Sequence, residues 1–155
     1  MTTTESINTT NELVLINNDR VAGYEKAIEE LQENKDQSNS DLITLFNGYI
    51  SDSRQFSSEL AAQVASEGGE PEEGTMASGK LYRAWMDVKA LFTGKDRHAI
   101  LASCEGGEDA AQKAYKTALA DDDLSPAART IVSRQQATLK QAHDHVKALR
   151  DSSKD

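Results

Sequence analysis

Apolar side chains recur along this chain at intervals of three and four residues, in four long segments. That spacing puts the apolar residues of each segment on one face of an α-helix. It predicts helices over residues 10–33, 41–66, 95–120 and 126–150. Two helix starts carry local signals: Thr9 and Glu12 have the spacing of a capping box, and Ser125 precedes Pro126 as an N-cap precedes a first-turn proline. No segment alternates with the period of two that a half-buried strand shows, so the pattern predicts an all-α bundle.

The second and fourth segments have the most regular apolar faces, and each face contains one small polar interruption. In the second the face is Leu42, Phe46, Tyr49, Ser53, Phe56, Leu60 and Val64. In the fourth it is Ala128, Val132, Gln135, Leu139, Ala142, Val146 and Leu149. Ser53 and Gln135 are therefore expected inside the bundle, where a polar group needs a hydrogen-bond partner.

The link between the second and third helices, residues 68–94, is much longer than the other two links. Short links make the first helix antiparallel to the second and the third antiparallel to the fourth. The long link can return along the bundle, so the third helix can start at the same end as the second. This predicts one domain over residues 9–151 with up-down-down-up topology, as in ferritin-like folds. Residues 1–8 and 152–155 are expected to be flexible.

The second half of this crossover predicts a short amphipathic helix over about residues 79–92. Its apolar face includes Leu81, Trp85, Met86 and Phe92. Two interpretations stay open, in which this face packs on its own bundle or meets a second copy of the chain. The second predicts a homodimer formed through the crossover helix.

Composition excludes several partners. The net charge is −9, from 17 basic and 26 acidic residues, which argues against binding a nucleic-acid backbone. No apolar run approaches the ~20 residues of a membrane span, and residues 1–10 do not resemble a secretory signal, so we expect a cytoplasmic protein. The single cysteine, Cys104, can form no internal disulfide. Residues 74–80 match most of a phosphate-binding loop, but Leu81 stands where that loop needs Ser or Thr and no strand precedes it, so nucleotide binding is rejected.

Charged and polar residues at one predicted level of the bundle suggest two kinds of site. Di-iron and di-manganese bundles use single glutamates from two helices and a Glu-x-x-His from each of the other two. This chain contains no Glu-x-x-His, but an iron or manganese site with fewer ligands could use Glu25, Glu105, Glu108 and His143. The interpretation we favour is a polar layer without metal, in which Arg54 neutralises Glu25 or Glu105 and the layer includes Ser53 and Gln135. No catalytic or cofactor-binding constellation is recognisable.

Two stretches, residues 16–31 and 68–115, resemble an uncharacterised bacterial family, a four-helix domain of unknown function in the ferritin-like superfamily. The resemblance covers residues 13–151 and implies a ferritin-like fold, a bacterial cytoplasmic origin and no established activity. Of the superfamily's metal-ligand positions, the resemblance implies only Glu25 and Glu105 in this chain. The missing Glu-x-x-His pairs argue against a di-metal centre. We therefore expect a non-catalytic binding or assembly protein. The alternative is a metal-binding (iron or manganese) oxidoreductase or a metal-handling or stress protein.

Overall fold

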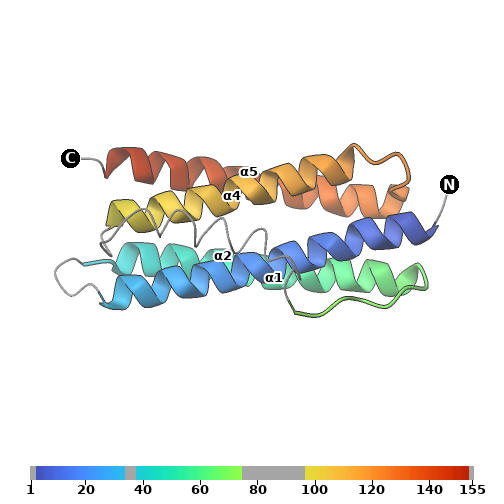
Figure 1. Cartoon of the computed structure of the whole chain (residues 1–155), viewed down its shortest axis with the longest axis horizontal. Coiled ribbons are helices and arrows are strands. Elements are labelled where there is room, and N and C mark those ends of the chain that lie inside the picture. The colour runs from blue at the N-terminus through green and yellow to red at the C-terminus, as the bar shows by residue number, and fades with distance from the viewer. Residues whose placement is uncertain (1–2, 34–37, 75–96, 154–155) are drawn as a thin grey trace.

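Four helices make up most of the residues that the computed structural model describes, which are 3–33, 38–74 and 97–153. They are α1 (Thr3–Glu33), α2 (Ser40–Ser66), α4 (Arg97–Leu119) and α5 (Pro126–Ser152), labelled as in Figure 1. These described residues contain no strand, so the all-α prediction is confirmed. Within the same ranges, no helix is both long enough and apolar enough to span a membrane.

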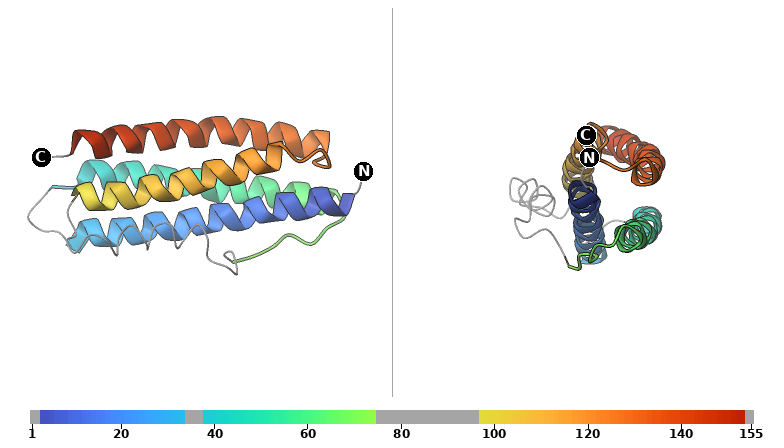
Figure 2. Two further views of the ribbon diagram at one scale, coloured as in Figure 1. Left: turned by 45° about the horizontal axis from the view of Figure 1, so that its top comes forward. Right: turned by 90° about the vertical axis from the view of Figure 1, so that its right-hand side faces the viewer.

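The helices form a four-helix bundle with up-down-down-up topology. In Figure 1, α1 and α5 run in one direction, and α2 and α4 run in the other. Seen end-on, α1 lies beside α2 and α4, and α5 lies beside α4 and α2 (Figure 2). Arg97 at the start of α4 pairs with Asp41 at the start of α2, with 2.5 Å between Nη2 and Oδ2. The two helices therefore begin at the same end, as the long crossover predicted.

Helix α1 begins at Thr3, so the predictions of a helix start near residue 10 and of a flexible segment over residues 1–8 were wrong for residues 3–8. Tertiary contacts extend the helix beyond the capping box. The Ser6 hydroxyl accepts a hydrogen bond from the Ser125 backbone amide (3.0 Å). Thr9, the predicted N-cap, lies inside the helix and donates its hydroxyl proton to Asp121 (2.8 Å). The turn between α4 and α5 thus holds the first turns of α1.

Helix α5 begins as predicted, and it continues to Ser152 rather than ending near residue 150. The Ser125 side chain accepts a hydrogen bond from the Ala128 amide (3.1 Å), so Ser125 is the N-cap before Pro126. At the other end, His98 on α4 lies 3.0 Å from the Arg150 carbonyl and 3.1 Å from the Ser153 hydroxyl. These contacts order the end of α5, where the sequence predicted a flexible tail from residue 152.

The described part of the crossover lies along α1. Gly68 ends α2 with a φ of 89°, a left-handed conformation that favours glycine. Asn11 then bonds the Glu70 carbonyl and the Glu72 amide, both at 2.9 Å, and Asn18 donates to the Gly74 carbonyl (2.6 Å). The predicted short helix over residues 79–92, its interface candidates Leu81, Trp85, Met86 and Phe92, and the predicted start of the third helix at residue 95 lie outside the described residues.

The core runs the length of the bundle, and its polar residues interrupt an otherwise apolar interior. On α2, the apolar residues Leu42 and Phe46 precede Ser53, and Leu60 and Val64 follow it; all five are buried. On α5, Gln135 is fully buried between apolar neighbours on the same face. These polar positions meet polar residues of α1 and α4 in the layer described next.

Candidate functional site

Helix α1 carries two polar side chains at positions that its spacing assigns to the core. Leu13, Asn17, Arg20 and Tyr24 follow one another at intervals of four, three and four residues, which is the repeat of a buried helix face. All four side chains are buried, with 0% exposure for Asn17 and 1% for Arg20. A charged guanidinium therefore lies inside the bundle, where only a close partner can compensate the loss of water.

Glu108 on α4 is that partner. Arg20 Nε lies 2.9 Å from Glu108 Oε1, and Nη2 lies 2.7 Å from Oε2, so the pair is bidentate. Arg20 Nη1 also donates to the Ser53 hydroxyl (2.7 Å) and to the Tyr49 carbonyl (3.2 Å), and the Tyr24 hydroxyl donates to Glu108 Oε2. Charge-assisted bidentate bonds of this kind are the strongest that protein side chains make.

The network continues across the bundle through Asn17, Tyr115 and Gln135. The Ser53 hydroxyl donates to Asn17 Oδ1 (3.0 Å), and Asn17 Nδ2 donates to the Tyr115 oxygen (2.7 Å). The Tyr115 hydroxyl in turn donates to Gln135 Oε1 (2.7 Å). One connected set of hydrogen bonds therefore joins all four helices. We call the set Asn17, Arg20, Tyr24, Ser53, Glu108, Tyr115 and Gln135 the interior polar layer.

The guanidinium of Arg20 and the phenols around it each keep one protonation state at neutral pH. Burial alone would lower the pKa of Arg20, but the charge and hydrogen bonds of the adjacent Glu108 carboxylate, together with the nearby phenols of Tyr24 and Tyr115, outweigh burial and raise it. Burial, followed by the charge of Glu108, raises the pKa of Tyr24 well above its usual value. Burial also raises the pKa of Tyr115, and it raises the pKa of Tyr49 to about 12. Arg20 therefore remains a cation and the phenols remain neutral, which suits a structural layer better than a general acid or base.

The interior polar layer does not fit the ligand set of a di-metal centre. Such a centre needs several free carboxylates and two imidazoles that face the bundle interior. The central carboxylate here is Glu108, and both of its oxygens are already bonded to Arg20. The sequence has no Glu-x-x-His to supply the imidazoles. The side chain of Arg20 instead supplies the positive charge inside the bundle.

The four residues predicted as metal ligands do not lie together. Glu25 is on the surface, 55% exposed, and pairs with Arg54, 65% exposed, at 3.2 Å. The predicted pairing of Arg54 with Glu25 is therefore confirmed, but the pair lies on the surface. The assignment of Arg54 to the polar layer was wrong, because the residue after Ser53 is rotated by about 100° from the buried face of a helix with 3.6 residues per turn. Glu108 belongs to the interior polar layer. Only Glu105 and His143 meet, with 3.3 Å between Oε1 and Nε2.

Glu105 and His143 lie with Asp109 in a group on the surface of the α4–α5 pair. One ligand atom from each of the three residues lies within 4.8 Å of the other two. The His143 and Glu105 side chains are 17% and 20% exposed, and that of Asp109 is 50% exposed. We call these three residues the α4–α5 surface group.

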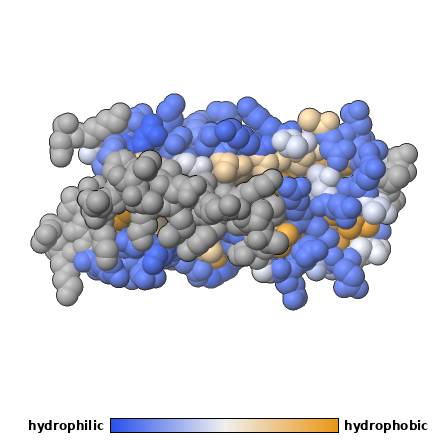
Figure 3. Space-filling view, in the orientation of Figure 1, coloured by the Kyte–Doolittle hydropathy of each residue, from blue (hydrophilic) through white to orange (hydrophobic). Residues whose placement is uncertain are grey.

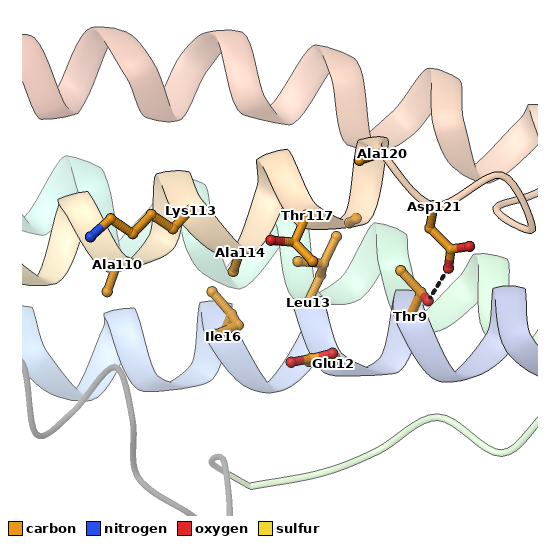
Figure 4. Close-up of a pocket in the computed structure, with 11 residues that line it drawn as sticks. Thr9, Glu12, Leu13, Ile16, Ala110, Lys113, Ala114, Thr117, Ala120 and Asp121 are labelled. Carbon is orange, nitrogen blue, oxygen red and sulfur yellow. Dashed lines mark hydrogen bonds between the residues drawn. The ribbon is translucent and has the colours of Figure 1, made fainter.

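A groove with a volume of about 630 Å³ lies between α1 and α4. In Figure 4, alanines of α4 face Leu13 and Ile16 of α1 across the groove, and the Thr9–Asp121 hydrogen bond crosses it. Figure 3 shows hydrophobic surface among hydrophilic residues on this face of the molecule. The small alanine side chains leave room along the seam between the two helices.

Sequence reasoning missed Asn17, Arg20, Tyr115 and Asp109. The regular spacing from Leu13 to Tyr24 was the available signal for Asn17 and Arg20, because it includes both in the buried face. The hydroxyl partners of Tyr115 lie on other helices, so they could not be identified from the sequence of one helix. Cys104, the single cysteine, is fully buried.

Comparison with known proteins identifies a family and a fold. Residues 5–121 match the family described as "Domain of unknown function (DUF2383)". The chain is also similar to the solved structure of a mutant of Dps1 from Mycobacterium smegmatis, with a TM-score of 0.81, 15% sequence identity, and 96% of each chain covered. At this identity the likeness concerns the fold, and it supports a ferritin-like four-helix bundle. No curated protein matches the sequence.

Proposed function

The chain belongs to the DUF2383 family of domains of unknown function, and we propose that it acts as a non-catalytic binding or assembly protein. The proposal rests on a ferritin-like bundle in which the Arg20 guanidinium, and not a metal ion, pairs with the interior carboxylate of Glu108. It concerns a bacterial cytoplasmic protein, in keeping with the family resemblance and the acidic composition.

The observation that carries the proposal is the bidentate contact between Arg20 and Glu108. A catalytic metal in a bundle interior needs carboxylates that are free to bind it. Arg20 donates a hydrogen bond to each oxygen of the carboxylate of this layer, and Tyr24 donates to one of the same oxygens. The remaining members of the layer are amides and hydroxyls that bond to one another. This arrangement favours a structural role for the layer, which fixes the relative register of four helices.

The alternative, an oxidoreductase that uses Glu25, Glu105, Glu108 and His143, has less support. The surface position of Glu25 and the interior position of Glu108 separate these two residues from the pair of Glu105 and His143. The test is iron(II) oxidation by the purified protein in air, followed spectroscopically. The proposal expects no rate above the buffer control, whereas a rate that is lost in Glu108→Ala and kept in Glu25→Ala would support an interior metal and overturn it.

Assembly is the activity that we propose for the outer surface. The predicted crossover helix offers Leu81, Trp85, Met86 and Phe92 as a contact with a second copy, and the α1–α4 groove adds apolar surface. We expect the full chain to be a homodimer. Apolar surface on a small protein often marks such a contact.

Light scattering during size-exclusion chromatography tests this contact. Trp85→Glu places a charge on the predicted apolar face and should give a folded monomer. Arg83→Glu is the matched control, since it adds a carboxylate on the opposite side of the predicted helix and should leave a dimer. A wild-type monomer at high concentration would contradict the assembly proposal.

A further inference from the structure

The α4–α5 surface group has the composition and spacing of a metal site, although it lies outside the interior polar layer. We propose that Glu105, Asp109 and His143 bind one divalent transition-metal ion, such as Zn²⁺ or Mn²⁺. Glu105 and Asp109 stand four residues apart on α4, so they share one face of that helix. His143 reaches them from α5. This inference adds a ligand to the proposed binding protein and does not depend on its oligomeric state.

The distances suit a small ion with little movement of the side chains. A tetrahedral ion with ligands at about 2.0–2.1 Å separates its ligand atoms by about 3.3–3.4 Å. His143 Nε2 lies 3.3 Å from Glu105 Oε1 and 3.8 Å from Asp109 Oδ1. All three ligand atoms are within 4.8 Å of one another. The His143–Glu105 separation thus matches that around a tetrahedral ion, and the His143–Asp109 separation exceeds it by about 0.4 Å.

A second carboxylate orients the imidazole for this role. His143 Nδ1 lies 3.0 Å from Asp144 Oδ1, and a carboxylate can only accept, so the Nδ1 proton points to Asp144. The other ring nitrogen, Nε2, faces the carboxylates of Glu105 and Asp109, where a bound ion would take its lone pair. Metal-binding histidines usually donate their other ring proton to a carboxylate or carbonyl in this way, because it fixes both the tautomer and the ring orientation. Asp144 is therefore a positioning residue for the site.

Neighbouring cations leave the required oxygens available. Arg150 Nη1 contacts Glu105 Oε2 (3.1 Å), and Lys113 Nζ contacts Asp109 Oδ2 (3.4 Å). In both carboxylates the other oxygen, Oε1 or Oδ1, is the one that faces His143. Each carboxylate can thus keep its ion pair while one oxygen binds the metal. The positive charge of Arg150 repels a cation at this position, so Arg150→Gln should raise the affinity for the metal ion.

The ligand set also indicates the class of ion. One imidazole with two carboxylates combines nitrogen and oxygen donors, which suits zinc, manganese or iron(II) better than magnesium. Three protein ligands leave a coordination position open to water or to a further ligand. The partial exposure of all three side chains gives an ion access from solvent.

The test is isothermal titration calorimetry with ZnCl₂ and, separately, MnCl₂ on the untagged full-length protein, with MgCl₂ as the hard-cation control. We expect one saturable Zn²⁺ site per chain. His143→Gln should weaken Zn²⁺ binding by at least about 100-fold, as expected when one of three ligands is lost, and Asp144→Asn should weaken it by about 10–100-fold, because it acts only through the imidazole. His145→Gln is the matched control, since His145 is exposed two residues away, and it should bind Zn²⁺ like the wild type.

Thermal unfolding gives an independent readout. An ion that binds only the folded protein raises Tm, so added Zn²⁺ should raise Tm for the wild type and His145→Gln and leave it unchanged for His143→Gln. Circular dichroism without metal should be the same for all three proteins, since the substitutions lie on the surface. No saturable Zn²⁺ binding, or equal affinity in His143→Gln and wild type, would overturn the site. Either result would leave the proposed dimer untouched, because that proposal is judged by the oligomeric state of the wild type and of Trp85→Glu.

Discussion

Replacement of Arg20 is the most informative perturbation of the interior polar layer. Arg20→Met keeps a long side chain at the same position and removes the charge. The carboxylate of Glu108, which is fully buried, then loses two charge-assisted bonds and keeps the hydroxyl of Tyr24 as a donor. Water cannot reach this position without opening the bundle, so the loss appears directly in the free energy of unfolding.

The size of the effect follows from this burial. Breaking one side of a buried ion pair costs about 3–5 kcal/mol. For a chain of this length that corresponds to a fall in Tm of roughly 6–20 °C. The double substitution Arg20→Met with Glu108→Met removes both charges, and its main remaining cost is the loss of the hydrogen bond from Tyr24 to Glu108, about 1–3 kcal/mol. The double variant should therefore be more stable than either single variant, with an interaction energy of at least about 3 kcal/mol.

Urea unfolding followed by circular dichroism measures all four free energies of this cycle. Arg54→Met is the matched control, because its ion pair with Glu25 is on the surface and should contribute no more than about 1 kcal/mol. If Arg20→Met costs as little as Arg54→Met, or if the effects of the two interior substitutions simply add, Arg20 does not compensate Glu108 in the way described.

Three further predictions concern packing, hydrogen bonding and pH. Gly69→Ala should destabilise the fold by about 1–3 kcal/mol, because its Cβ would lie 2.6 Å from a methyl group of Ile7 on α1. Gly48→Ala has open space on an exposed helix face, so it should stabilise the fold by about 0.5–1 kcal/mol. Tyr115→Phe should cost about 1–3 kcal/mol, because buried amides lose the hydroxyl that joins them. A hydrogen bond from Arg97 lowers the pKa of Asp41, so Asp41→Asn should lower Tm at neutral pH.

Each of these predictions has a measurement and a contrary result. Thermal and urea unfolding compare Gly69→Ala with Gly48→Ala, and equal effects would mean that α1 does not pack tightly on residue 69. A neutral Tyr115→Phe would mean that the layer is not connected through its hydroxyl. For Asp41, a lowered folded pKa stabilises the protein above the unfolded value of about 3.9, and this contribution is lost as the pH falls. The Tm difference between wild type and Asp41→Asn should therefore shrink as the pH falls below about 3.9, and a difference that stays constant as the pH falls would contradict the ion pair.

The topology was predictable because it depends on features that one sequence displays. A long link and two short links determine which helices run parallel, and apolar spacing identifies the buried face of each helix. Ser125 and Pro126 marked the start of α5 because an N-cap works through atoms only three residues apart.

The first turns of α1 and the interior cation could not be predicted in the same way. The start of α1 depends on residues such as Ser125 that are distant in sequence, so a local capping signal at Thr9 was misleading. Arg20 was missed because a charged residue is rarely buried unless another helix supplies its partner. Which of the two arginines, Arg20 or Arg54, faces inward depends on the rotation of each helix, and the partner Glu108 settles it in the folded protein.

The metal content of the protein tests most directly whether the Arg20–Glu108 pair leaves no metal site inside the bundle. It should be measured by mass spectrometry on wild type and His143→Gln, both purified without chelator or affinity tag. If the interior has no metal site, His143→Gln should contain no iron or manganese, and the wild type should contain at most one surface ion per chain. Two ions per chain that persist in His143→Gln and are lost in Glu108→Ala would show that Glu108 binds metal inside the bundle, and would contradict its pairing with Arg20.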